Sequence, residues 1–226
     1  MSELEKQNTV ESTNQVFTNI TYEGKEGGSP RIMFVGNSIT RHGVRPEVGW
    51  FNDWGMAASS KENDYVHRII SFVQEKYPDA YFCIVQAAIW EWDYKREEYD
   101  SDFAPAKLFN PDIIICQISE NVSMDAYEIE AFAENMNKFH TYLKGENKDC
   151  KIIQGSSFFS NVEKDKGIKL FTERYGATYV DMFDISRDES NLAIGLFEHK
   201  GVQIHPGDKG MKALADRYIE ELKKIL

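Results

Sequence analysis

The chain has 226 residues, of which 42% are hydrophobic and 28% are charged. This is the composition of a globular protein with one buried core, and the length fits a single domain better than two. The formal net charge of −11 argues against nucleic acid and anionic membrane surfaces as partners. No apolar run is long enough for a transmembrane helix. The cysteines are odd in number and lack metal-ligand spacing, so we expect reduced, buried thiols at Cys83, Cys116 and Cys150.

The beginning of the chain differs in composition from the rest. Residues 1–28 form a polar extension with a possible short strand over 16–22 and a glycine-rich link over 24–28. The first residues lack the apolar core of a secretory signal, which predicts a cytoplasmic location. We expect residues 29–226 to form a single α/β domain.

Within that domain, apolar runs alternate with amphipathic segments. Strands are predicted over 32–35, 81–85, 113–117, 152–154 and 177–181. Helices are predicted where apolar residues recur every three or four positions, over 65–77, 129–143 and 211–225. This alternation predicts a parallel five-stranded sheet with helices on both faces, a three-layer α/β/α fold. We expect the flavodoxin-like strand order 2-1-3-4-5, which brings the loops after Val35 and Gln117 into one crevice.

The first predicted strand runs into Gly36-Asn37-Ser38-Ile39-Thr40 and leaves a hydroxyl at its carboxyl end. Open α/β sheets carry their chemistry at that edge. A serine nucleophile needs a base and donors for the oxyanion, whereas a serine without them is a turn or helix-capping residue. The Gly-x-Ser-x-Gly elbow is not matched, because Thr40 stands at the second glycine.

Two more polar residues follow strands or open helices. Asn121 lies just past the third strand, where its amide could donate to an oxyanion or cap a helix near Asp125. His205 precedes the last helix and is the candidate base. His42 and His199 lie in loops and could contact a ligand. Neither metal-ligand spacing nor a nucleotide-binding glycine motif occurs, so we predict no metal and no cofactor.

The order of these residues resembles the SGNH, or GDSL, hydrolases. That family has a Gly-Asp-Ser block after the first strand, a later Gly-x-Asn-Asp block and a final Asp-x-x-His-Pro block. The resemblance spans about residues 31–226. It implies that Ser38 is the nucleophile, that His205 is the general base, and that Asn121 and the Ser38 backbone N–H hold the oxyanion.

The sequence also departs from the family pattern. Asn37 replaces the first aspartate, and Ser119 and Val122 replace the glycine and aspartate around Asn121. The family's second block supplies a glycine N–H to the oxyanion. Here Glu91 is near that position and could keep the backbone donor while adding a carboxylate. Gly55 is a rival donor.

The largest departure is Val202, which stands three residues before His205 where the family has its acid. Removing the equivalent aspartate from a serine protease lowers turnover about 10⁴-fold. Three explanations are open. A backbone carbonyl orients the imidazole, another carboxylate does so, or the protein is catalytically weak; we favour the first two. The candidate carboxylates are Glu91, Glu120 and Glu198.

Four tryptophans follow the first two strands: Trp50, Trp54, Trp90 and Trp92. Their rings could bind a sugar or a short acyl group, or pack the loops. The sequence thus predicts a serine esterase that cleaves a small or carbohydrate-linked ester through an acyl-enzyme. The alternative is a catalytically weak or inactive SGNH-fold protein that binds a ligand or carbohydrate.

Overall fold

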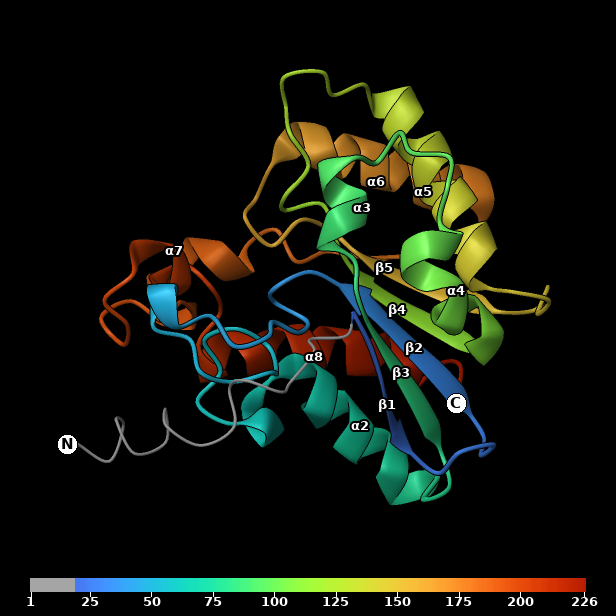
Figure 1. The fold of residues 1–226 in the computed structure, drawn as a ribbon, viewed down its shortest axis with the longest axis horizontal. Coiled ribbons are helices and arrows are strands. Elements are labelled where there is room, and N and C mark those ends of the chain that lie inside the picture. Colours follow the sequence, from blue (N-terminus) through green and yellow to red (C-terminus); the bar gives the residue numbers. More distant parts are fainter. Residues whose placement is uncertain (1–18) are drawn as a thin grey trace.

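The computed structural model describes residues 19–226. A six-stranded sheet lies between two layers of helices (Figure 1). Its strands are β1 Ile20–Gly24, β2 Arg31–Gly36, β3 Tyr81–Gln86, β4 Ile113–Gln117, β5 Lys151–Gly155 and β6 Thr178–Val180. The helices are α2 Tyr65–Lys76, α3 Ala88–Trp92, α4 Asp100–Phe109, α5 Ile129–Leu143, α6 Val162–Tyr175, α7 Lys200–Gln203 and α8 Asp208–Leu222.

The strand order is β1-β3-β2-β4-β5-β6. The five parallel strands therefore have the predicted order 2-1-3-4-5, and the three-layer fold is confirmed. The prediction of a wholly parallel, five-stranded sheet is wrong at one edge, because β1 adds an antiparallel strand beside β3. This strand begins at Ile20, and positions 16–18 of the strand predicted there lie outside the described residues. β1 covers what would otherwise be an open sheet edge.

Both faces of the sheet are buried, and successive side chains of a strand enter opposite cores. In β2, Ile32 and Phe34 pack with residues of α2 and α8. Met33 and Val35 pack with residues of α4, α5 and α6. Figure 1 shows the same division, with α2 and α8 on one face and α3 to α6 on the other. The three cysteines are free and buried, as expected.

Four of the described helices, α3, α4, α6 and α7, are missing from the sequence prediction. α3 and α7 have only five and four residues, too few for a periodic signal, and the two longer helices carry residues that interrupt it. On α6, Lys164 and Asp165 are among the buried residues. On α4, Pro105 lies inside the helix and Leu108 is 83% exposed. Between residues 19 and 226, no helix is both long and apolar enough to cross a bilayer.

The register of the central strands determines where the loops meet. Gly36 at the end of β2 pairs with Gln86 of β3 and with Gln117 of β4. A Cβ atom on Gly36 would lie 1.7 Å from the Thr40 Oγ1 atom. Only glycine therefore lets Thr40 fold back over the strand, where its hydroxyl lies 2.6 Å from the Tyr65 hydroxyl. This tight turn holds Ser38 at the carboxyl edge of the sheet.

Candidate active site

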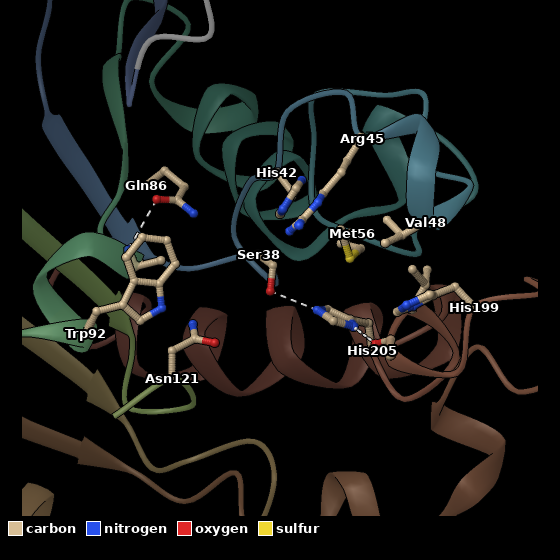
Figure 2. Close-up of a pocket in the computed structure, with 13 residues that line it drawn as sticks. Ser38, His42, Arg45, Val48, Met56, Gln86, Trp92, Asn121, His199 and His205 are labelled. Carbon is tan, nitrogen blue, oxygen red and sulfur yellow. Dashed lines mark hydrogen bonds between the residues drawn. The ribbon is translucent and has the colours of Figure 1, made fainter. Parts of the chain in front are cut away.

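Ser38 and His205 meet although 167 positions separate them in the chain. The Ser38 Oγ atom lies 2.8 Å from the His205 Nε2 atom (Figure 2). The serine lies in a single turn in which the Asn37 carbonyl accepts from the N–H groups of Thr40 and Arg41, each at 3.0 Å. On the other side, the Ala193 N–H donates to the His205 carbonyl at 3.0 Å. Both loops are thus fixed by backbone hydrogen bonds.

The backbone orients the imidazole. The His205 Nδ1 atom lies 2.7 Å from the Gly201 carbonyl oxygen. A carbonyl can only accept, so Nδ1 carries the proton and Nε2 turns its lone pair to the serine hydroxyl. Burial lowers the pKa of His205 to about 4, although the hydrogen bond to Gly201 opposes this shift. At neutral pH the ring is uncharged and in the tautomer that a general base needs.

None of the three proposed substitute acids occupies this position at Nδ1. Glu198 is exposed, and the hydrogen bonds of Glu91 and Glu120 are with other groups. Val202, at the family's acid position, is 1% exposed and belongs to a small apolar cluster with Trp50, Met56, Ala57 and Ala193. A carboxylate would be unfavourable in that cluster, and the Gly201 carbonyl stands at Nδ1 instead.

Glu91 is the centre of a second network. Its carboxylate is fully buried and accepts from the Asn121 Nδ2 atom at 2.6 Å, the Asn37 Nδ2 atom at 3.0 Å and the Ser119 N–H at 2.6 Å. Burial, together with the nearby charge of Glu120, raises the pKa of Glu91 to about 7. Glu91 therefore holds the two asparagines beside Ser38.

The loop that carries Asn121 is fixed from below. The Lys164 Nζ atom donates to the carbonyls of Ser119 at 2.7 Å and Glu120 at 2.9 Å. The Glu120 carboxylate accepts from Asn37 at 2.6 Å and from the Phe158 N–H at 2.8 Å. Ser119 has a φ of 132°, a region that favours glycine. Ser119 thus carries a side chain in a backbone conformation that favours glycine.

Of the predicted oxyanion donors, two are engaged elsewhere. The Glu91 N–H bonds to the Ala87 carbonyl at 3.3 Å within α3, and the Gly55 N–H bonds to the Asp64 carboxylate at 3.0 Å. Asn121 lines the cleft beside Ser38 and uses one Nδ2 hydrogen on Glu91, which leaves the second.

Ala88 is a backbone donor that the sequence analysis missed. It lines the cleft, and its N–H donates to the Gln86 Oε1 atom at 3.2 Å. Ala88 stands two residues after β3, which is the signal that could have found it. Glu91, three residues further on, already lies inside the helix that this turn begins.

Ser38 and His205 open into a cleft of about 280 Å³. Of the four tryptophans, only Trp92 lines it, with 70% of its surface exposed. Trp50 and Trp90 are buried, and Trp90 stacks on Phe139 with ring centroids 5.1 Å apart. Trp54 is partly buried and donates its ring N–H to the Ala58 carbonyl at 3.0 Å. The expectation of four substrate-facing rings reduces to one, because the other three are packed in the fold.

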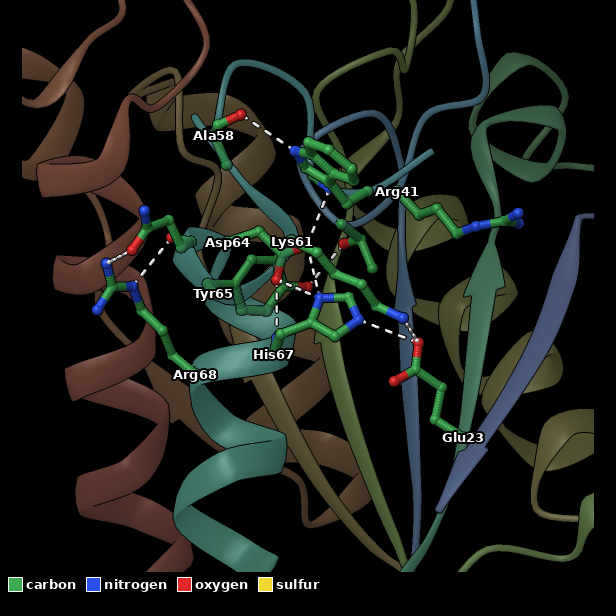
Figure 3. A network of polar contacts seen from close by, with 12 residues as sticks. Glu23, Arg41, Ala58, Lys61, Asp64, Tyr65, His67 and Arg68 are labelled. Carbon is green, nitrogen blue, oxygen red and sulfur yellow. Dashed lines mark hydrogen bonds and ion pairs between the residues drawn. The ribbon is translucent and has the colours of Figure 1, made fainter. Parts of the chain in front are cut away.

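A partly buried ion-pair network supports the Ser38 loop (Figure 3). The Asp64 carboxylate accepts from Gly55 at 3.0 Å and from the His67 Nδ1 atom at 2.8 Å. The His67 Nε2 atom lies 3.0 Å from the Glu23 carboxylate on β1. Next to Gly55, the Met56 N–H donates to the Ser38 carbonyl at 2.8 Å. The Ser38 turn is thereby connected to α2 and to the edge strand.

The described residues contain no group of three His, Cys, Asp or Glu side chains that could hold a metal ion. The site thus consists of a serine, a histidine held by a backbone carbonyl, and amide donors at the carboxyl edge of a parallel sheet. This fold and this arrangement place the chain among α/β proteins with an SGNH/GDSL hydrolase-type fold.

Solved structures of that fold resemble this chain over most of its length. A family two carbohydrate esterase from Clostridium thermocellum matches with a TM-score of 0.60 and 14% identity, over 87% of this chain and 64% of that one. A protein described as a GDSL-like lipase from Bacteroides uniformis matches with a TM-score of 0.57 and 15% identity, over 86% and 96%.

A two-domain esterase active on acetylated mannans, crystallised with mannopentaose, matches with a TM-score of 0.57 and 16% identity. The match covers 86% of this chain and 49% of that chain, so this chain spans about half the length of the esterase. No protein-family model and no curated protein sequence matches. At these identities the likeness establishes the fold.

Proposed function

We propose that this protein is a serine esterase that hydrolyses a small or carbohydrate-linked carboxylic ester through an acyl-enzyme. The observation that carries the proposal is the contact of 2.8 Å between the Ser38 Oγ atom and a neutral His205 whose Nδ1 proton is held by Gly201. The family's acid is replaced by a backbone dipole, which makes this a Ser-His dyad.

In the first half of the reaction, the Ser38 oxygen attacks the acyl carbon while the His205 Nε2 atom takes the hydroxyl proton. The carbonyl π electrons move to oxygen and form a tetrahedral oxyanion. Collapse of that intermediate breaks the bond to the alcohol oxygen, which takes the proton from His205 and leaves as the alcohol. Ser38 then carries the acyl group as an ester.

The oxyanion needs donors placed before the reaction begins. We assign this role to the Ser38 N–H, the free Nδ2 hydrogen of Asn121 and the Ala88 N–H. The Ala88 N–H donates to the Gln86 Oε1 atom at 3.2 Å. The oxyanion would displace this side-chain oxygen and accept from the Ala88 N–H in its place. Glu91 acts through Asn121 and is a positioning residue, because its carboxylate bonds to the asparagine amide.

In the second half, water attacks the acyl carbon and gives a proton to the His205 Nε2 atom. The second tetrahedral intermediate expels the Ser38 oxygen, which recovers the proton from His205, and the carboxylic acid leaves. The cleft of about 280 Å³ suits a short acyl group. Trp92 at the cleft offers a ring face of the kind on which sugar rings stack. The acetylated-mannan esterase with the same fold is consistent with such a substrate.

Replacement of the nucleophile tests the proposal. We expect Ser38→Ala to abolish hydrolysis of p-nitrophenyl acetate and labelling by a fluorophosphonate, with at least a 10³-fold loss of turnover. Ser71→Ala, at an exposed serine on α2, is the matched control and should retain both. A series of acyl esters from acetyl to octanoyl should show falling kcat/KM with chain length. Labelling or hydrolysis that survives in Ser38→Ala would refute the assignment, and a wild-type protein that shows neither activity would support the binding-protein alternative.

A further inference from the structure

One wall of the cleft carries groups that hydrolysis of a simple ester does not use. Arg45, His42 and His199 line the cleft together with Ser38 and His205. Among the residues described as lining it there is no aspartate or glutamate. The whole chain, by contrast, has a formal net charge of −11. A cationic pocket in an acidic protein attracts an anionic ligand to that pocket specifically.

Arg45 presents the charge. Its Nε atom donates to the Glu47 carboxylate at 2.9 Å, which leaves the opposite edge of the guanidinium with its two terminal nitrogens. Figure 2 shows the guanidinium extending beside His42 toward the space in front of Ser38. That edge matches the two oxygens of a carboxylate. Glu47 is exposed, does not line the cleft and pairs with the Nε edge, so the terminal nitrogens of Arg45 still face a ligand.

His42 presents a different kind of contact. Its Nδ1 atom lies 2.7 Å from the Gly43 carbonyl and therefore carries the proton. Burial lowers the pKa of His42, so the ring is neutral at pH 7 and its Nε2 atom is a hydrogen-bond acceptor. An acceptor repels a carboxylate and binds a hydroxyl. The ligand that fits this wall has both a carboxylate and a hydroxyl group.

We propose that the cleft binds esters of acidic sugars, with the sugar carboxylate on Arg45, a ring hydroxyl on His42 and the scissile ester at Ser38. Trp92, in the same cleft, offers a flat ring to the sugar. This inference rests on the proposed esterase function and specifies its substrate class.

A matched pair of substrates tests it. The O-acetyl esters of methyl glucuronoside and methyl glucoside differ only in a carboxylate and a hydroxymethyl group. We expect wild-type kcat/KM to be at least tenfold higher for the acidic ester. The ratio should approach one in Arg45→Gln and take an intermediate value in Arg45→Lys, which keeps the charge but loses the planar fork. Arg174→Gln removes an exposed arginine paired with Glu130 on α5 and should keep the wild-type ratio.

The outcomes separate the two proposals. Equal kcat/KM for both esters, or a preference that Arg45→Gln leaves intact, overturns the acidic-sugar inference while the esterase function holds. If neither ester is hydrolysed and Ser38 is not labelled, the esterase function fails. Calorimetric titration of the Ser38→Ala protein with the two unacetylated glycosides then decides the binding question. Tighter binding of the glucuronoside that depends on Arg45 supports the site, and equal binding overturns it.

Discussion

The Glu91 carboxylate is completely buried, and in each of its hydrogen bonds it accepts from an N–H group of Asn37, Ser119 or Asn121. Those donors fit an ionised carboxylate, whereas burial and the charge of Glu120 favour the protonated form and raise the pKa of Glu91 to about 7. The same site contains His205, whose pKa burial lowers to about 4. Burial therefore shifts the two pKa values in opposite directions: it raises that of the acid Glu91 and lowers that of the base His205.

These two pKa values predict the pH dependence of kcat/KM, which reports ionisations of the free enzyme. As the pH falls through about 7, Glu91 gains a proton and loses an acceptor for the asparagines, so we expect a partial decline of a few-fold. As the pH falls through about 4, His205 is protonated and activity is lost. Glu91→Gln should remove the first step, keep the second and lower the plateau about tenfold or more. A single step near pH 6.5 in both proteins would contradict this assignment.

Ser119 carries local strain in its φ of 132°, and its buried hydroxyl has no hydrogen-bond partner among the described residues. The Cβ atom of a serine in this conformation costs about 1–2 kcal/mol of stability, which glycine avoids. Glycine in turn loses more conformational entropy on folding, which costs about 0.5–1 kcal/mol. Removal of an unpaired buried hydroxyl adds to the gain.

We therefore expect Ser119→Gly to raise the free energy of unfolding in urea by about 1 kcal/mol. The control is Ser71→Gly in the exposed part of α2, which should lower that free energy by about 0.5–1 kcal/mol. Equal destabilisation by both substitutions would show that Ser119 is not strained.

At the scale of elements, the active site joins two loop systems through a small apolar cluster. Trp50, Met56 and Ala57 come from the segment after Ser38, and Ala193 and Val202 come from the segment before His205. The Ser59 N–H and hydroxyl also bond to the Asp208 carboxylate at the start of α8, at 2.8 and 2.6 Å. These contacts bring Ser38 and His205 together. The family's acid position lies inside this packing.

Restoring an acid at that position should therefore fail. We expect Val202→Asp to lower the free energy of unfolding by about 3 kcal/mol, because it places a charge in an apolar cluster. No gain in kcat/KM should follow, since the Gly201 carbonyl already occupies Nδ1 at 2.7 Å. Val202→Ala separates lost packing from buried charge. Higher turnover in Val202→Asp at unchanged stability would show that the new carboxylate had displaced Gly201.

For the whole molecule, the edge strand β1 is attached by charge as well as by the sheet. His67 lies between Asp64 and Glu23, and hydrogen bonds to these carboxylates overcome burial and raise its pKa to about 9. The hydrogen bonds from His67 and Lys61 likewise overcome burial and lower the pKa of Glu23 to about 2. The protonated histidine connects β1 to α2 through the buried Asp64 and the partly exposed Glu23.

The raised pKa of His67 gives a stability contribution that is complete below pH 6.5 and is lost as the pH rises through about 9. His67→Gln should thus lower the free energy of unfolding most at pH 6, by on the order of 2 kcal/mol, and less at pH 9.5. Denaturant melts at the two pH values measure the difference, with Arg174→Gln as a surface control. A loss that is the same at both pH values would mean that the charge on His67 contributes nothing.

The sequence by itself determined the layer architecture, the order of the five parallel strands and the candidates Ser38, Asn121 and His205. Hydrophobic periodicity and turn residues are local properties, and right-handed crossovers leave few topologies. Among the helices that were missed, α4 and α6 lack a clean periodic signal because Pro105 interrupts the first and Lys164 the second. Only the tertiary structure decided what orients His205, which amides remain free and which tryptophan reaches the cleft. The contact between Gly201 and the His205 imidazole spans only four positions, but it depends on the backbone conformation of that turn. The other answers depend on hydrogen bonds and packing between segments far apart in the chain, such as Glu91 with Asn121.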